Sequence, residues 1–316
     1  MRSATAPCIL ILLIAASTGM TQETRSAPQG ARSAMNRAVL DGIELEYEVQ
    51  GAGEPVVLVH AGVLAGWFKP LMDEPALSRR YRLVRYHRIG YAGSSRIAGP
   101  VSLGDQARHL RALMRHLGIE RAHFVGHSSS GNIVLQAALD APHLVHSLAL
   151  LEPALLGVPS GPQVAKAVLV PAVERYRAGD KAGAVETFMQ GVTGPAYRAA
   201  LEKALPGGFE QAVADADTFF GQELPALRQW SFSREDARRI TQPVLAVLGA
   251  KSDDIRPTSE GASRVFRERH ELLLAWLPNV EPFILPDATH LLHVENPRGM
   301  AEGLVAFFAR HPLSVK

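Results

Sequence analysis

Three adjacent serines stand in the segment Gly-His-Ser-Ser-Ser-Gly at residues 126–131, where one of them could act as a nucleophile. A short apolar strand is expected to run into this segment and a helix to leave it. The backbone of a nucleophile on such a sharp turn is strained and crowded, so its neighbours two places before and after must be small. Ser128 meets this requirement with Gly126 and Ser130, whereas centring the turn on Ser129 would put the bulky histidine in a crowded position.

The segments around this turn alternate between strands and helices. Continuous apolar runs, typical of strands buried on both faces of a parallel sheet, are separated by stretches with helical spacing. The expected strands cover 55–60, 81–88, 145–152, 243–249 and 280–286, and the expected helices cover 102–117, 258–277 and the segments after residues 128 and 296. An Asp-Gly turn at residues 41–42 indicates an antiparallel edge. This order predicts an α/β protein with a doubly wound, mostly parallel sheet.

The turn resembles the nucleophile elbow of the α/β-hydrolase superfamily, Gly-x-Ser-x-Gly, with Ser130 in the place of the second glycine. Two further segments carry the resemblance. The sequence His-Ala-Gly at 60–62 ends the strand at 55–60, and Thr-His-Leu-Leu-His-Val-Glu-Asn-Pro at 289–297 follows the last strand. The likeness extends over nearly all of residues 38–310. It implies the α/β-hydrolase fold with a helical cap inserted after strand six.

The resemblance also implies roles for individual residues. A serine hydroxyl is a poor nucleophile until a base removes its proton, and family members carry the catalytic histidine after the last strand, which here implies His290 as the base for Ser128. Two backbone amides form the family's oxyanion hole, and the matching positions are Gly62 and Ser129. His60, at a buried strand end, is interpreted as a structural residue that hydrogen-bonds to its loop.

Two positions could supply the acid that orients the base. Most family members carry it after strand seven, where Asp253 or Asp254 stands, and some relatives carry it at the end of strand six, where Glu152 stands. In the usual pattern the acid follows the strand-ending glycine by three positions, and counting from Gly249 this position is Ser252. A buried glutamate is costly unless it is paired, whereas aspartates in a loop are ordinary solvated residues. We therefore predict Glu152 as the acid, with Asp253 as the alternative.

The chain divides into segments of different character. Residues 154–240 show no strand pattern, are rich in alanine and contain Gly-Pro and Pro-Gly breaks, so they are the expected helical cap. Residues 35–153 and 241–316 are the expected hydrolase core. Residues 1–34 are interpreted as a signal peptide or a disordered N-terminal extension. The protein would be exported or periplasmic in the first case, and cytoplasmic if translation starts at Met35.

Composition narrows the classes of function. The chain has 316 residues, of which 47% are hydrophobic and 20% charged, and its formal charge of +2 leaves no basic footprint for nucleic acid. Cys8 is the only cysteine, so a disulfide framework and a thiolate metal site are excluded. The apolar run that follows it is shorter than the roughly 20 residues that a stable membrane span needs. A small-molecule substrate is the expected partner, and the oligomeric state stays open.

These observations predict acyl transfer to water, in which a Ser-His-acid triad cleaves an ester-type bond of a small, apolar substrate without a cofactor. Serine members of the family also cleave carbon–carbon bonds or lactones, or make peracids, and the sequence leaves these activities open. A hypothesis of another class is a non-catalytic ligand receptor on a hydrolase scaffold. The presence of every triad element argues against it.

Overall fold

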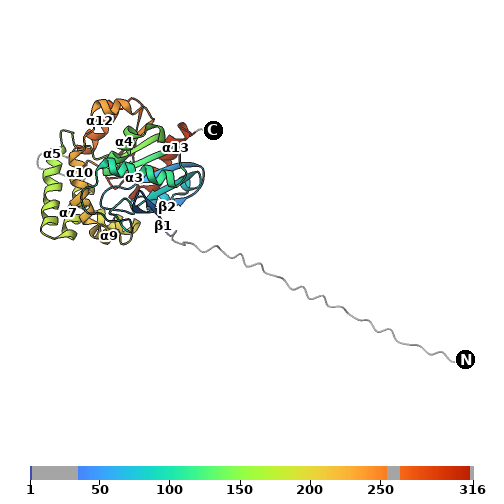
Figure 1. The fold of residues 1–316 in the computed structure, drawn as a ribbon, viewed down its shortest axis with the longest axis horizontal. Coiled ribbons are helices and arrows are strands. Elements are labelled where there is room, and N and C mark those ends of the chain that lie inside the picture. Colours follow the sequence, from blue (N-terminus) through green and yellow to red (C-terminus); the bar gives the residue numbers. More distant parts are fainter. Residues whose placement is uncertain (2–34, 255–263, 314–316) are drawn as a thin grey trace. The chain divides into compact units, whose positions relative to one another are not determined.

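The computed structural model describes Met1, residues 35–254 and residues 264–313 (Figure 1). The rest of the leader predicted at 1–34 lies outside the described residues, and so does the first part of the helix expected at 258–277. The residues from Ala34 onward cluster as one compact unit.

An eight-stranded sheet with the order β1-β2-β4-β3-β5-β6-β7-β8 forms the centre of this unit. Its strands are β1 (Asn36–Leu40), β2 (Ile43–Gln50), β3 (Glu54–Val59), β4 (Tyr81–Tyr86), β5 (Ala122–His127), β6 (Val145–Leu151), β7 (Val244–Gly249) and β8 (Val280–Leu285). β2 pairs antiparallel with β1 and β4, and every other neighbouring pair is parallel. The prediction of a mostly parallel sheet with an antiparallel edge is confirmed.

The inner strands are apolar along their whole length because helices cover the sheet. Every residue of β5 and of β7 is buried, which an alternating strand exposed on one face would not allow. The helices of the core are α1 (Lys69–Met72), α2 (Pro75–Ser78), α3 (Leu103–His116), α4 (Ser129–Asp140), α12 (Val265–Trp276) and α13 (Pro297–Arg310). α3 packs against α4, while α13 packs against α1 and α2. Two single turns of 3-10 helix cover Pro142–Leu144 and Leu292–Val294.

Local sequence signals set the ends of the longer helices. Ser102 caps α3 through a capping box with Asp105, in which each side chain satisfies a backbone amide of the other residue. Asn296 caps α13 by accepting a 2.9 Å hydrogen bond from the Gly299 amide, and Pro297 occupies the first helical position, where its missing N–H costs nothing.

The chain between β6 and β7 is described throughout residues 154–240, and it contains helices and loops with no strand. We call it the helical insertion. Its elements are α5 (Gly161–Val164), the π-helix η2 (Ala165–Leu169), α6 (Val170–Arg177), α7 (Lys181–Thr193), α8 (Tyr197–Ala204), α9 (Gly208–Ala214), the π-helix η3 (Asp217–Glu223), α10 (Leu224–Gln229) and α11 (Arg234–Arg239). In Figure 1, α5, α7, α9 and α10 stand together on the side opposite α13.

Candidate active site

The strand-to-helix turn between β5 and α4 has the strained geometry that its sequence predicts. Ser128 is the N-cap of α4 and has φ of 52°, a left-handed conformation that few non-glycine residues adopt. A Cβ atom on Gly126 would lie 2.6 Å from the carbonyl oxygen of Ser130, so only glycine fits there. Strand and helix therefore approach closely, and Ser128 stands at the apex between them.

Ser130 replaces the second glycine of the pattern and acquires a structural task. Its hydroxyl donates to the carbonyl oxygen of Val59, at 2.5 Å, and accepts from the amide of His127, at 2.8 Å. The side chain thus ties the turn to the end of β3. The requirement for glycine passes to Gly131, where a Cβ atom would meet Pro153 at 2.6 Å.

The predicted base and the predicted acid meet in the structure. His290 Nδ1 lies 2.5 Å from Glu152 Oε2, and the amide of Gly249 donates to the other carboxylate oxygen at 2.7 Å. The exposed fractions are 4% for His290 and 2% for Glu152, so neither group is satisfied by water. Because the carboxylate accepts the bond, the proton of the neutral imidazole lies on Nδ1 and leaves Nε2 as an acceptor.

The alternative acid has a different task. The carboxylate of Asp253 accepts hydrogen bonds from the amides of Phe266, at 3.2 Å, and Arg267, at 3.1 Å, at the start of α12. It therefore satisfies free helix amides instead of orienting the imidazole. Burial raises the pKa of Asp253, and the two amides act against this rise. Asp254 is exposed.

Parallel strand topology explains why these residues converge. β5 lies between β3 and β6, so the residues after the carboxyl ends of the three strands reach the same edge of the sheet. These residues are Gly62, Ser128 and Glu152. The loop that carries His290 follows β8 and reaches the same edge from further along the sheet.

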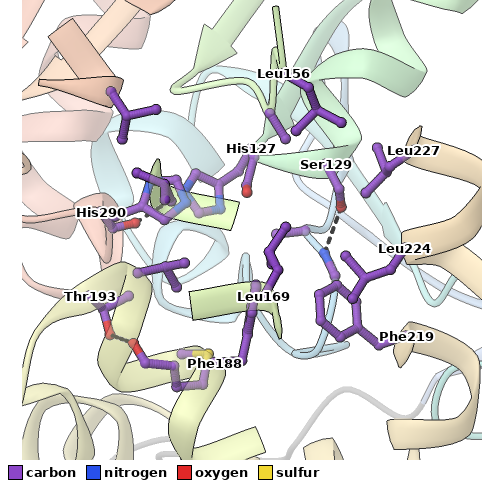
Figure 2. A pocket seen from close by; sticks show the side chains of 18 of the residues that line it. His127, Ser129, Leu156, Leu169, Phe188, Thr193, Phe219, Leu224, Leu227 and His290 are labelled. Atoms are coloured by element: carbon purple, nitrogen blue, oxygen red, sulfur yellow. Dashed lines mark hydrogen bonds between the residues drawn. The ribbon is translucent and has the colours of Figure 1, made fainter. Parts of the chain in front are cut away.

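Ser128, Ser129, Gly62 and His290 line one pocket. Figure 2 labels Ser129 and His290 among the side chains around it. The helical insertion contributes much of its wall through the apolar side chains of Val164, Leu169, Phe188, Met189, Val192, Phe219, Leu224 and Leu227, and the core adds Trp67 and Phe266. The volume of this cavity is about 90 Å³. In the described part of the chain, no direct hydrogen bond joins the Ser128 hydroxyl to His290, a contact that in many enzymes tightens only around substrate.

Aromatic residues of the insertion divide between this pocket and helix packing. Phe188 and Phe219 line the pocket. Phe220 instead stacks on Tyr176, with ring centroids 5.3 Å apart. Trp230 lies in a neighbouring groove and donates its indole N–H to Gln136 at 2.7 Å.

The histidines near the site are held neutral. His60 Nδ1 donates to the carbonyl of Ala61 at 2.7 Å while Nε2 accepts from the amide of Arg88 at 2.9 Å, which confirms the predicted structural bond to the loop. Burial, aided by the charge of Arg88, lowers the pKa of His60 well below its usual value. Burial also lowers the pKa of His293 to about 3, and its Nε2 donates to the carbonyl of Trp67 at 2.9 Å. Both rings support loops around the pocket.

The two predicted oxyanion donors are linked by a side chain. The amide of Gly62 donates to the hydroxyl oxygen of Ser129 at 2.9 Å, and this hydroxyl donates to Oε1 of Glu223 at 2.5 Å (the first bond is drawn in Figure 2). Glu223 was not predicted as a site residue. Its only sequence signal is an acid within the mostly apolar segment of residues 218–227, because the residues it contacts are far away along the chain.

Among residues 35–254 and 264–313, no group of three or more His, Cys, Asp or Glu side chains is arranged to hold a metal ion. The helices in those ranges also include none that is long and apolar enough to cross a membrane.

Residues 54–297 match the family model described as alpha/beta hydrolase fold. The chain belongs to this family. A curated relative, the dihydrolipoyllysine-residue acetyltransferase component of the acetoin cleaving system of Pseudomonas putida, is 29% identical over 93% of this chain and 72% of its own length. Other curated relatives match over 31–41% of this chain and 34–45% of their own length.

Solved structures of this family have the same fold as the chain. A thermophilic esterase from Thermogutta terrifontis superposes with a TM-score of 0.70 at 20% identity, covering 89% of this chain and 100% of the esterase. A hydrolase from Pseudomonas aeruginosa PA01 superposes with a TM-score of 0.66 at 26% identity, covering 88% of this chain and 99% of that protein.

Proposed function

We propose that the protein is a serine hydrolase of the carboxylesterase type, with Ser128 as the nucleophile, His290 as the base and Glu152 as the acid. The observation that carries this proposal is the 2.5 Å contact between His290 and Glu152 beside the pocket that Ser128 lines. An imidazole with its proton on Nδ1 presents Nε2 to the serine hydroxyl, and the carboxylate stabilises the imidazolium that forms.

The reaction follows from these roles. Ser128 Oγ attacks the carbonyl carbon of the substrate while its proton passes to Nε2 of His290, and the amides of Ser129 and Gly62 donate to the oxyanion. The tetrahedral intermediate expels the alcohol, which takes the proton from His290 and leaves an acyl-enzyme. Water then attacks the acyl carbon, giving its proton to His290. The acid leaves as the proton returns to Ser128.

The substrate proposed for this site is an ester of a small, apolar acid. The pocket wall is mainly aliphatic and aromatic, which favours an apolar acyl group by burial of its surface. Since one water molecule needs at least about 10–15 Å³ of such space, a cavity of about 90 Å³ suits an acyl group of a few carbon atoms.

We assign the helical insertion, residues 154–240, the role of a cap on the core of residues 35–153 and 241–316. The side chains that it contributes to the pocket support this assignment. A cap excludes water from the acyl-enzyme and strengthens the polar contacts beneath it.

The proposal is tested by turnover of a panel of esters, lactones and diketones by the wild type and by Ser128→Ala, with Ser231→Ala as a control. We expect short-chain esters to be hydrolysed by the wild type and the control and not by Ser128→Ala. Saturable binding of these compounds without turnover would contradict the proposal and favour the receptor hypothesis. Preferred cleavage of diketones or lactones would keep the triad but change the bond that is broken.

A further inference from the structure

A buried ion pair joins the helical insertion to the core beside the pocket. Arg88, two residues after β4, donates through Nη2 to both carboxylate oxygens of Glu223, at 3.1 and 2.9 Å. The exposed fractions are 0% for Arg88 and 6% for Glu223. Burial alone would lower the pKa of Arg88, but the Glu223 carboxylate outweighs it and raises this pKa, so the arginine stays charged. Tyr91 donates its hydroxyl to the same carboxylate.

The Glu223 carboxylate can accept more hydrogen bonds than this ion pair supplies, and one of them comes from the turn at Ser128 and Ser129. Glu223 Oε1 accepts the hydroxyl proton of Ser129 at 2.5 Å. A serine hydroxyl has one hydrogen, and this bond uses it, so the Ser129 oxygen can only accept further hydrogen bonds. It accepts one from the amide of Gly62 at 2.9 Å. A continuous chain of hydrogen bonds therefore runs from the insertion through the Ser129 hydroxyl to the amide of Gly62, one of the two predicted oxyanion donors.

The surrounding contacts fix the place from which Glu223 acts. Asp215, two residues before η3, accepts a hydrogen bond from the amide of Ala92 at 3.0 Å, and the Thr218 hydroxyl donates to the carbonyl of Gly90 at 2.7 Å. Both bonds clamp this part of the insertion to the loop after β4. A Cβ atom on Gly62 would lie 2.5 Å from the Phe219 ring, so the insertion also packs tightly against the oxyanion loop.

We propose that Glu223 is a positioning residue for the oxyanion hole: by fixing the Ser129 hydroxyl it holds the Gly62 amide at the pocket that Ser128 lines, and the single hydrogen of this amide is shared between Ser129 Oγ and the oxyanion as the oxyanion forms. The inference rests on the proposed function. Arg88 balances the carboxylate charge, which would otherwise repel the negative charge that develops at the substrate oxygen. A donor held close to its final place before the reaction costs little reorganisation when the oxyanion forms.

The test compares Glu223→Asp, Ser129→Ala and the double variant with the wild type. Aspartate keeps the charge opposite Arg88 but withdraws the carboxylate from Ser129 by one methylene. Ser129→Ala leaves the ion pair and the Ser129 amide in place and removes only the hydroxyl, so it decides the matter if Glu223→Asp fails to fold. Glu186→Asp is the matched control, because this carboxylate also lies in the insertion but binds Tyr197 and Arg198.

Two assays are used. The first gives kcat and KM for 4-nitrophenyl acetate, and the second gives the rate at which a fluorophosphonate, whose phosphoryl oxygen also needs the oxyanion donors, labels Ser128. We expect both single variants to lose about tenfold or more in kcat and in labelling rate, with KM within about threefold of wild type, because a displaced oxyanion donor loses part of the factor of about 10²–10³ that removal of a donor costs. The double variant should lose little more activity than the less active single variant, since both changes break the same chain of hydrogen bonds. Glu186→Asp should stay within about twofold of wild type.

Wild-type rates or faster turnover in folded Ser129→Ala would overturn the inference, because the hydroxyl would then be neutral or a competitor for the Gly62 amide. Multiplicative losses in the double variant would overturn it as well. A wild type that is neither labelled nor active would remove the proposed function and the inference together. Labelling that Ser128→Ala abolishes, with unchanged rates in the Glu223 and Ser129 variants, would remove the inference alone.

Discussion

Two buried carboxylates flank the turn that carries the proposed nucleophile Ser128, and they differ in the partner each one has. Glu152 follows β6 in the sheet and lies 2.5 Å from the imidazole of His290. Glu223 ends η3 in the helical insertion and is paired with the guanidinium of Arg88 at 2.9 Å. Histidine changes its charge near neutral pH, whereas arginine keeps its charge at every pH that a folded protein tolerates.

This difference in partner separates two uses of a buried acid. The pair of Glu152 and His290 can accept a proton from a nucleophile and return it, because the imidazole has two accessible protonation states. The pair of Glu223 and Arg88 has one state and can only hold other groups in place. The comparison predicts a large loss of activity for changes in the first pair and a smaller one for changes in the second.

The largest effect is expected from changes in the proposed nucleophile and in the proposed base of the first pair. Ser128→Ala and His290→Ala should each reduce kcat by several orders of magnitude, and the double variant should be little worse, since the residues act as one unit. Kinetics on the best ester from the panel measure this. Full activity in either single variant would break the comparison by removing proton transfer from this pair.

The second prediction separates the two candidate acids. Glu152→Gln should lower kcat by roughly 10³–10⁴, because the amide can favour the wrong imidazole tautomer and cannot stabilise the imidazolium. Asp253→Asn is the matched control and should lose less than about tenfold, since it caps α12. Far-UV circular dichroism checks that both variants are folded. Near wild-type activity in Glu152→Gln would move the role to the loop after β7.

The third prediction concerns His293, a buried histidine beside the site, and the effect of acid on the stability of the fold. His293 has a pKa of about 3 in the folded protein because of burial, well below the value of about 6.5 of an unfolded chain. Below pH 6.5 the unfolded state therefore binds a proton that the folded state excludes. The free energy of unfolding should fall as pH drops from about 6.5 toward 3, by up to about 1.4 kcal/mol per pH unit for this residue.

Urea denaturation between pH 7 and pH 5 measures this slope. His293→Gln should show a shallower pH dependence than the wild type, and the exposed His143→Gln should leave it unchanged. Equal slopes in His293→Gln and the wild type would show that other groups control the acid response.

The smallest effect is expected from removal of residues 1–34. Both carboxylates and their partners lie after Met35, and the first strand begins at Asn36. A chain that starts at Met35 should therefore fold and turn over substrate as the full chain does. Ester kinetics and the yield of folded protein measure this, and loss of either would assign the leader a structural task.

Local features were predictable from the sequence. The small flanks of Ser128 are neighbours along the chain, so the strained turn could be recognised without knowing the fold. The strands and the Asn-Pro start of α13 at residue 296 likewise depend on spacing within one segment. For these features the sequence alone was sufficient, because the interactions that define them are short in range.

The proposed acid and the proposed positioning residue depend on contacts that only the tertiary structure brings about. Glu152 lies 138 residues from His290 along the chain, and Glu223 lies 94 residues from Ser129. The sequence could rank Glu152 above Asp253 only by the cost of an unpaired buried charge, and it offered no reason to connect Glu223 with Ser129 or Arg88. The physical reason is that a side-chain hydrogen bond needs its two atoms within about 3 Å, and only the packing of the sheet and the insertion brings such distant residues that close.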